Sequence, residues 1–256
     1  MSSDLLFYLV GLPAVFFIGL GKGAFGGGLA IIGVPLLALV IDPIDATIVV
    51  ALVASATDMF ALKAFPMNTW SWPDMIWLAP ALLLGTVIGA LFFALIDLRV
   101  LVLCIAILTL FFTLRYFFHA RAQSFSSTPV SGIKALTYGT VAGFTTFVAH
   151  AGAAPLTVYL QERGLPKSTF VGTSIALLMM TNLIKIIPYG WFGIQRPFAL
   201  WDALVLLPAA PIGVWIGKVM HDRIDQRKLY FWCYLLVGVA GMKLLIDSIL
   251  NLVGSF

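Results

Sequence analysis

Charged residues are scarce in this sequence: aspartate, glutamate, lysine and arginine together make up 10% of its 256 residues. A soluble globular domain carries about 25% charged residues, so a chain that is 61% hydrophobic does not belong to that class. The mean hydropathy of +1.06 points the same way. The 15 lysines and arginines are scattered rather than clustered, which argues against a nucleic-acid partner. We therefore expect an integral membrane protein, with the lipid bilayer as its surroundings.

Cysteine, histidine and acidic residues are also few. Cys104 and Cys233 both lie inside apolar runs, where they are expected as small buried side chains rather than as a disulfide. No cluster of His, Cys and carboxylate residues has zinc-site spacing, and neither a nucleophile elbow nor a P-loop is present. Three histidines and 11 acids leave little material for acid–base catalysis. These absences argue against an enzyme, and they predict no metal site and no cofactor.

Long apolar runs are what the sequence has in abundance. The eight apolar stretches are Leu5–Ile41, Ala46–Phe65, Met75–Ile96, Val100–Phe118, Ile133–Leu160, Thr169–Ile187, Ala203–Met220 and Leu229–Val253. Six of them have the length of a single crossing of a hydrocarbon core about 30 Å thick. The first is too long for one helix, and the fifth is interrupted between His150 and Pro155. The sequence predicts an all-α membrane protein with about eight hydrophobic segments, two of them irregular.

The first irregular segment contains an unusual density of glycine. Six glycines lie between Gly19 and Gly28, with the cation Lys22 among them. Each glycine costs a helix interior about 0.8–1.0 kcal/mol relative to alanine, so we expect this cluster to interrupt the helix. A membrane tolerates broken backbone only where it is buried in protein or lines a cavity. Interrupted segments of this kind are the usual indication of a transporter's binding site.

The chain also repeats itself about its midpoint. The matched polar residues and glycines are Asp74 and Asp202, Gly85 and Gly213, and Gly89 and Gly217 at a shift of 128, Lys63 and Lys185 at 122, and Gly23 and Gly143 at 120. Matches of this type are informative in an apolar chain, whereas apolar coincidences are not. We expect a first transmembrane repeat over residues 1–121, a polar linker over 122–132 and a second repeat over 133–256, each repeat headed by a broken helix or hairpin.

Charge predicts how the two repeats are oriented. If each irregular segment crossed the membrane once, six loop cations would face one side and four the other. If each is a hairpin, eight share one side: Arg115, Arg121, Lys134, Arg163, Lys167, Arg223, Arg227 and Lys228. Only Arg99 and Arg196 then lie opposite. The second arrangement obeys the positive-inside rule better, so we expect inverted repeats of four to five segments and both termini outside.

Candidate site residues come from both irregular segments and from the helices after them. For substrate binding they are Lys22, Gly26, Gly27, Gly28, His150, Asn182 and Lys185, and for proton coupling Asp58 and His150. Backbone N–H groups at broken helix ends and intramembrane cations suit an anion. An ionisable group such as Asp58 inside an apolar run is a functional hypothesis by default.

Plainer interpretations of these residues remain open. Lys22 either contacts the ligand or only marks a hairpin tip that faces the cytoplasm. Asp58 either carries protons or pairs with Lys63 or a broken helix end. His150 is either a proton carrier or a satisfied polar side chain. Lys185, with Asn182 on the same helix face and Pro188 after it, either faces the pathway or does not.

The glycine-rich stretch carries a resemblance to a known family. Residues Gly19 to Leu39, with Gly-Lys-Gly, a Gly-Gly-Gly run and Val-Pro-Leu, resemble the first motif of the TauE/SafE family of sulfite and organosulfonate transporters. The stretch from Gly143 to Gly152 is similar to that family's second hairpin, and Phe170–Thr173 and Asn182–Tyr189 continue the match. Ala153 and Ala154 depart from the family pattern, which has Gly or Pro there.

The resemblance implies a secondary transporter or exporter of small sulfur-containing anions in a bacterial inner membrane, working by alternating access. Export of an anion from a negative interior needs no coupling ion, whereas import would need one, such as a proton. Two alternatives are an integral-membrane enzyme acting on a phosphorylated lipid carrier, which would need acids at the hairpin tips, and an anion channel. We expect a small anionic substrate as partner and no nucleic acid.

Overall fold

The computed structural model describes residues 5–27, 43–93, 128–194, 197–223 and 225–253, with single residues and pairs between 33 and 41 and between 103 and 118. All of the regular structure in these ranges is helical. The helices are α1 (Leu5–Phe25), α3 (Pro43–Ala64), the short 3₁₀ helix η1 (Met67–Thr69), α4 (Trp72–Phe93), α6 (Gly132–Ala149), α7 (Ala153–Glu162), α8 (Lys167–Ile194), α9 (Pro197–Leu206), α10 (Ala209–Arg223) and α11 (Gln226–Val253).

Several of these helices are long and apolar enough to cross a membrane. Within the described residues there are three, at Leu5–Phe25, Trp72–Phe92 and Lys167–Ile187. A fourth is added if Ala199–Leu206 and Ala209–Arg223, which meet at a bend of 44°, form one span. The expected crossing at Val100–Phe118 lies largely outside the described residues.

The α6–α7 segment is a helical hairpin. Helix α6 ends at Ala149, the next residue His150 adopts the left-handed conformation (φ 53°), and α7 begins at Ala153. The ammonium of Lys134, near the start of α6, lies 3.0 Å from a carboxylate oxygen of Glu162, the last residue of α7. Both ends of the hairpin therefore lie at the same end of the molecule, and its tip lies at residues 150–152.

The helix is interrupted within the glycine cluster, as expected. Gly19, Gly21 and Gly23 all lie within α1, and the helix ends at Phe25, so the interruption falls in the last part of the cluster. The break comes at Gly26 and Gly27, whose φ values of 69° and 106° disfavour other residues. Gly28 lies outside the described residues.

The glycines inside α1 serve helix packing instead. A Cβ atom at Gly19 would overlap the carbonyl oxygen of Ala210, and one at Gly213 would overlap that of Phe16. In the same way, Gly85 of α4 and Gly143 of α6 each approach the backbone of the other helix. Small residues at such spacing let helices pack closely in membranes, and the gain in packing outweighs glycine's low helix propensity.

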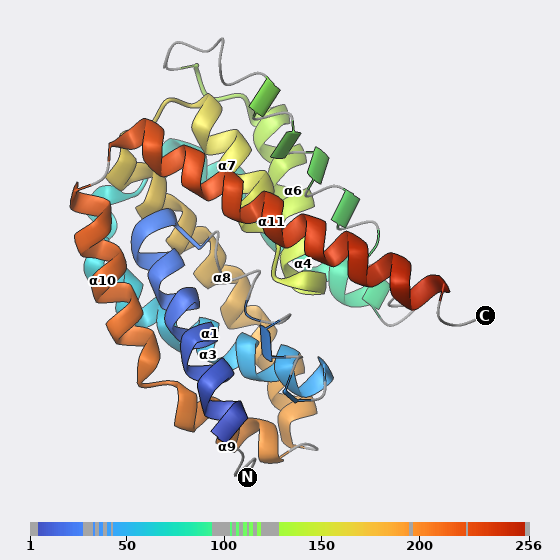
Figure 1. Ribbon diagram of the computed structural model, residues 1–256. Coiled ribbons are helices and arrows are strands. Elements are labelled where there is room, and N and C mark those ends of the chain that lie inside the picture. The colour runs from blue at the N-terminus through green and yellow to red at the C-terminus, as the bar shows by residue number, and fades with distance from the viewer. Residues whose placement is uncertain are drawn as a thin grey trace.

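These two close helix pairs join the two halves of the sequence. In both pairs the contacting residue numbers rise together, so α1 runs parallel to α10, and α4 runs parallel to α6. Figure 1 shows α1 and α10 side by side on one flank, with α6 and α7 on the other. Helix α8 contacts both groups and lies between them (Figure 1). Each half of the chain thus contributes to both sides of the bundle.

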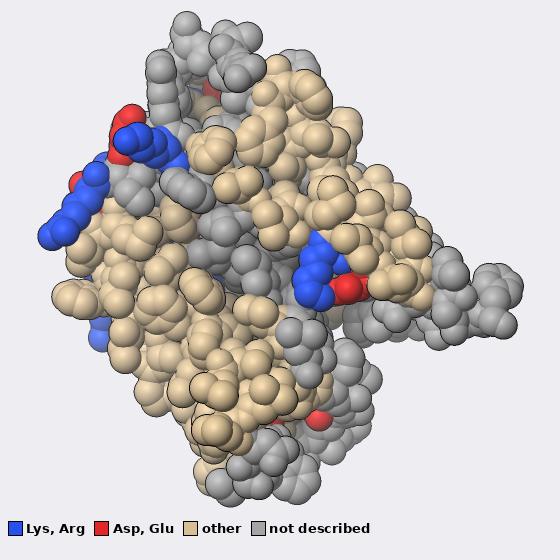
Figure 2. All heavy atoms as spheres, in the orientation of Figure 1, with Lys and Arg blue, Asp and Glu red and all other residues tan. Residues whose placement is uncertain are grey.

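One end of the bundle gathers five of the described basic residues. They are Lys134 and Arg163 at the ends of the α6–α7 hairpin, Lys167 at the start of α8, Arg223 at the end of α10 and Lys228 near the start of α11. The ammonium of Lys167 donates to the carbonyl of His221 at 2.8 Å, which brings the start of α8 to the end of α10. Figure 2 shows Lys and Arg atoms at the upper left, and one further group of Lys or Arg atoms beside Asp or Glu atoms at the centre right of the face.

Candidate functional site

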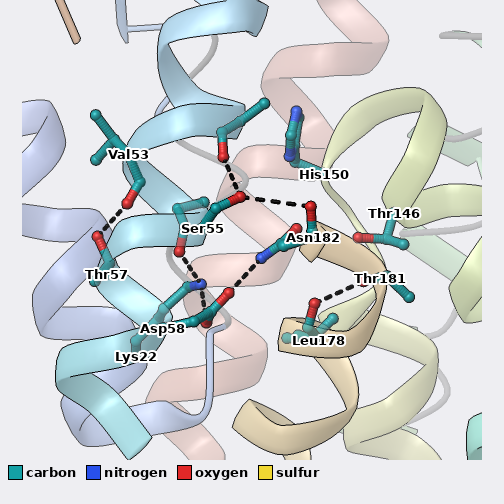
Figure 3. Close-up of polar contacts among 12 residues, drawn as sticks. Lys22, Val53, Ser55, Thr57, Asp58, Thr146, His150, Leu178, Thr181 and Asn182 are labelled. Atoms are coloured by element: carbon teal, nitrogen blue, oxygen red, sulfur yellow. Dashed lines mark hydrogen bonds and ion pairs between the residues drawn. The ribbon is translucent and has the colours of Figure 1, made fainter. Parts of the chain in front are cut away.

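A buried ion pair lies at the centre of the bundle. The ammonium of Lys22 on α1 pairs with the carboxylate of Asp58 on α3 and donates to the carbonyl of Ala54 at 2.8 Å. The amide Nδ2 of Asn182 on α8 donates to the second oxygen of Asp58 at 2.7 Å. Lys22 and Asp58 are 2% and 0% exposed, so both charges are removed from solvent and lipid. Figure 3 shows the three side chains converging.

A second buried ammonium lies one helical turn further along α8. Lys185 is 1% exposed and donates to the carbonyl oxygen of Thr146 at 2.8 Å and to its hydroxyl at 3.2 Å. Its Nζ lies 3.4 Å from Nδ1 of His150. All of these partners are neutral, and no carboxylate in the described part of the chain forms an ion pair with Lys185. Its ammonium is therefore hydrogen-bonded but has no ion-pair partner of its own among these residues, since the nearest acid of the site, Asp58, is paired with Lys22.

One face of α8 connects the two broken segments. Ser174, Leu178, Asn182 and Lys185 follow one another at helical spacing on this face. A Cβ at Gly26 or Gly27 would contact Ser174 or Leu178, so the break after α1 lies against the first part of this face. The tip of the α6–α7 hairpin lies against its last part, through Lys185. The two broken segments thus approach a single helix from different halves of the chain.

The second hairpin also offers a buried helix start. Every residue from Ala153 to Leu160 of α7 is buried, and the helix begins three residues after His150. The start of a helix carries the positive end of the helix dipole, which favours a negative charge nearby. In α7 the N–H groups of Ala154 and Leu156 donate to Ala151 and Gly152, so the dipole rather than free N–H groups supplies this effect. The dipole of α7 and the positive charge of Lys185 therefore both favour a negative charge at this hairpin tip.

Buried side chains close the end of the site that faces the basic residues. His221 on α10 is fully buried, with Nε2 3.2 Å from the hydroxyl of Ser168 and Nδ1 3.4 Å from the carbonyl oxygen of Ala24. Its ring packs edge-on against Phe65, with the ring centroids 5.0 Å apart. These contacts hold together the ends of α1, α3, α8 and α10 on the side of the Lys22–Asp58 pair that faces the basic residues.

Most of the residues singled out from the sequence meet in this region. Lys22, Asp58, His150, Asn182 and Lys185 are brought together, as the contacts above establish. Gly26 and Gly27 lie at the break one turn beyond Lys22, and Gly28 is outside the described residues. The interpretation that paired Asp58 with Lys63 is wrong, because the partner of Asp58 is Lys22 and Lys63 is exposed.

Sequence reasoning missed two polar residues. Thr146 supplies both of its oxygens to Lys185, and Ser55 lies 3.5 Å from the carbonyl oxygen of Asn182 while donating to Ala51 at 2.7 Å. Thr146 precedes His150 by one helical turn, a spacing that could have indicated it. Ser55 has no comparable signal. Among the described residues no group of three His, Cys, Asp or Glu side chains could hold a metal ion.

Comparison with known families identifies one relationship. The family model described as "Sulfite exporter TauE/SafE" matches residues 11–244, which include every residue of the site. Comparison with curated proteins and with solved structures finds no match.

Proposed function

The chain belongs to the TauE/SafE family of sulfite exporters and is a multi-pass membrane transporter, and from this premise we propose that it carries a small sulfur-containing anion, sulfite or an organosulfonate, through the site around Lys185. The proposed ligands are Lys185, His150 and Asn182, with Lys22 and the backbone at Gly26, Gly27 and Gly28 contributing from the first half. Asp58 acts on the substrate through Lys22 and Asn182.

The observation that carries this proposal is the uncompensated charge of Lys185. A buried cation without a negative partner is costly, and its usual partners are absent from the described residues around it. Its three contacts are neutral oxygen and nitrogen atoms, so a bound anion would supply the missing charge. The buried start of α7 beside His150 adds further stabilisation of an anion. A bound oxyanion would accept a hydrogen bond from the Lys185 ammonium.

A purely structural role for Lys185 is the main competing explanation. Because its ammonium donates to Thr146, near the end of α6, it also caps the last turn of that helix. A cap of this kind needs a hydrogen-bond donor but not a full buried charge. The capping role and the anion-binding role can be distinguished, because a neutral hydrogen-bond donor at residue 185 would still cap α6 but would no longer bind the anion.

Alternating access would come from rocking of inverted repeats around the fixed site. Two observations support this arrangement: the α6–α7 hairpin has both ends on one side, and the basic residues gather at that same end. If that end is cytoplasmic, as the positive-inside rule predicts, both termini are outside. The contacts of His221 then close the site towards the cytoplasm.

Export in a bacterial inner membrane would need no coupling ion. Each negative charge that leaves a negative interior gains about 2.3 kcal/mol per 100 mV. Import would require coupling, for which Asp58 and His150 are the candidate proton carriers. The Lys22–Asp58 pair supports such a role for Asp58, because moving a proton onto the carboxylate would remove the charge that holds Lys22.

The test is the flux of radiolabelled sulfite into proteoliposomes, with and without an imposed pH gradient. We expect saturable flux from the wild type and a loss of about tenfold or more in Lys185→Gln, since a hydrogen bond to a charged group contributes about 1.5–3 kcal/mol. Lys243→Gln is the matched control, because Lys243 is part of an exposed pair with Asp247 in α11. Full flux in Lys185→Gln would contradict the proposed site, and flux that never saturates would indicate a channel.

A further inference from the structure

We propose that this site selects its substrate by charge number and takes monoanions in preference to dianions, because its buried side chains leave one positive charge to be balanced. This inference rests on the proposed function and specifies its substrate class. The site contains two ammonium groups, those of Lys22 and Lys185, and one carboxylate, that of Asp58. Two positive charges and one negative charge leave a net charge of +1.

The protonation of His150 follows from its contact with Lys185. An ammonium group only donates hydrogen bonds, so Nδ1 of His150, 3.4 Å from Nζ of Lys185, faces it with a lone pair. The imidazole is then neutral and adds nothing to the count. A protonated ring would instead turn an N–H towards a cation, which both hydrogen bonding and Coulomb repulsion oppose.

Two other charge pairs lie near the bundle interior, and a further buried carboxylate, that of Asp202, belongs to α9 and to no hydrogen bond or ion pair of the cluster around Lys185. Asp74, fully buried at the start of α4, accepts hydrogen bonds from Arg163 at 2.7 Å and from Tyr159 at 2.8 Å. Lys218 pairs with Asp222 in α10. These pairs lie at the basic end of the molecule, away from Lys185. Within the described part of the chain, Lys185 therefore carries the charge that a substrate must meet.

Because the site is buried away from water, its net charge decides which anions it binds. A monoanion bound beside Lys185 makes the buried cluster neutral, whereas a dianion leaves one uncompensated negative charge away from water, which is strongly unfavourable. The favoured substrates are organosulfonates and hydrogen sulfite, in which an SO₃ head group carries a single charge. Sulfate and the sulfite dianion have similar head groups but one charge more. The shape of the head group alone would not distinguish the monoanions from the dianions, whereas the number of charges does.

The test compares methanesulfonate, a fixed monoanion, with sulfate, a fixed dianion, as ligands of the purified protein by calorimetry. We expect the wild type to bind methanesulfonate more tightly than sulfate by about tenfold or more. Asp58→Asn raises the net charge to +2 and should shift the preference towards sulfate. The double variant Lys22→Met/Asp58→Asn returns the net charge to +1. It should bind both anions more weakly, because Lys22 is itself a proposed ligand, but it should restore the preference for methanesulfonate over sulfate.

The variants keep the proposal falsifiable even if one of them folds poorly. Equal affinity of the wild type for both anions would overturn it, as would a double variant that prefers sulfate. If Asp58→Asn is stable and its preference is unchanged, net charge is not the selector and the proposal is wrong. Failure of the proposed function would look different, because the wild type would then carry no sulfite at all in the flux assay.

Discussion

At the scale of single residues, the site depends on how Lys22 and Asp58 compensate each other. Neither group has access to water, and each is held by a second partner, the carbonyl of Ala54 for Lys22 and the amide of Asn182 for Asp58. Removing one member of a buried pair costs more than removing both, because the remaining charge stays buried. The pair is therefore best tested as a unit.

We expect Lys22→Met alone to lower the free energy of unfolding by about 3–5 kcal/mol, since it leaves the Asp58 carboxylate unpaired. Lys22→Met/Asp58→Asn should lie much closer to the wild type, because no charge is stranded and the new side-chain amide can still accept a hydrogen bond from Asn182. Unfolding in detergent micelles, followed by circular dichroism, measures both variants. If the double variant is as unstable as the single one, Lys22 stabilises the fold through packing rather than through the pair.

At the scale of helices, close glycine contacts hold the two halves together. Helices α1 and α10 approach through Gly19 and Gly213, and α4 and α6 approach through Gly85 and Gly143. Because both pairs connect residues more than 50 positions apart in the sequence, they define how the two halves interlock. The site residues on α1 and α6 take their positions from these contacts.

A methyl group at Gly19 should force α1 away from α10. We expect Gly19→Ala to cost about 1–3 kcal/mol of stability, as overpacking does, because the obstacle is the backbone oxygen of Ala210. Gly11→Ala is the control on the same helix. There the new Cβ meets only the side-chain end of Leu206, at 2.9 Å, which can turn aside. Thermal unfolding measures the stability of both variants. An equal loss of stability in the two would show that the close backbone contact at Gly19 is unimportant.

At the scale of the whole molecule, charge asymmetry predicts the orientation in the membrane. The described cations gather where the α6–α7 hairpin opens and where α1 and α10 end, while α1 begins at the opposite end. With the positive-inside rule, we predict that Lys134 lies in the cytoplasm and Leu5 outside.

Single cysteines introduced at these two positions test the orientation. In a background lacking Cys104 and Cys233, Lys134→Cys should react with a membrane-impermeant maleimide only after the cells are opened. Leu5→Cys should react in intact cells. Both side chains are accessible, at 58% and 73% exposure. The reverse pattern would place both termini in the cytoplasm and would also reverse the direction in which His221 closes the site.

Much of the candidate site was predictable from sequence, because its signals are local. Intramembrane Lys, His and Asn are rare, and the positions of Lys22, His150, Asn182 and Lys185 stand out in an apolar chain without any knowledge of the fold. The sequence predicted that the first segment is interrupted by the glycine cluster, but not at which glycine the helix ends. Composition counts the glycines between Gly19 and Gly28, but it does not distinguish those that pack against another helix from those that end one.

The membrane class, the helical architecture, the two irregular segments and the family were predictable from the amino-acid sequence alone. These follow from hydropathy and from the spacing of Gly, Pro and polar residues, which are properties of neighbouring positions. The folded structure was needed to show that Lys22 is the partner of Asp58 and that Thr146 holds Lys185. Those features depend on contacts between residues 36 and 39 positions apart, and on Asn182 reaching Asp58 across 124. Such contacts exist only after the two halves have packed around α8.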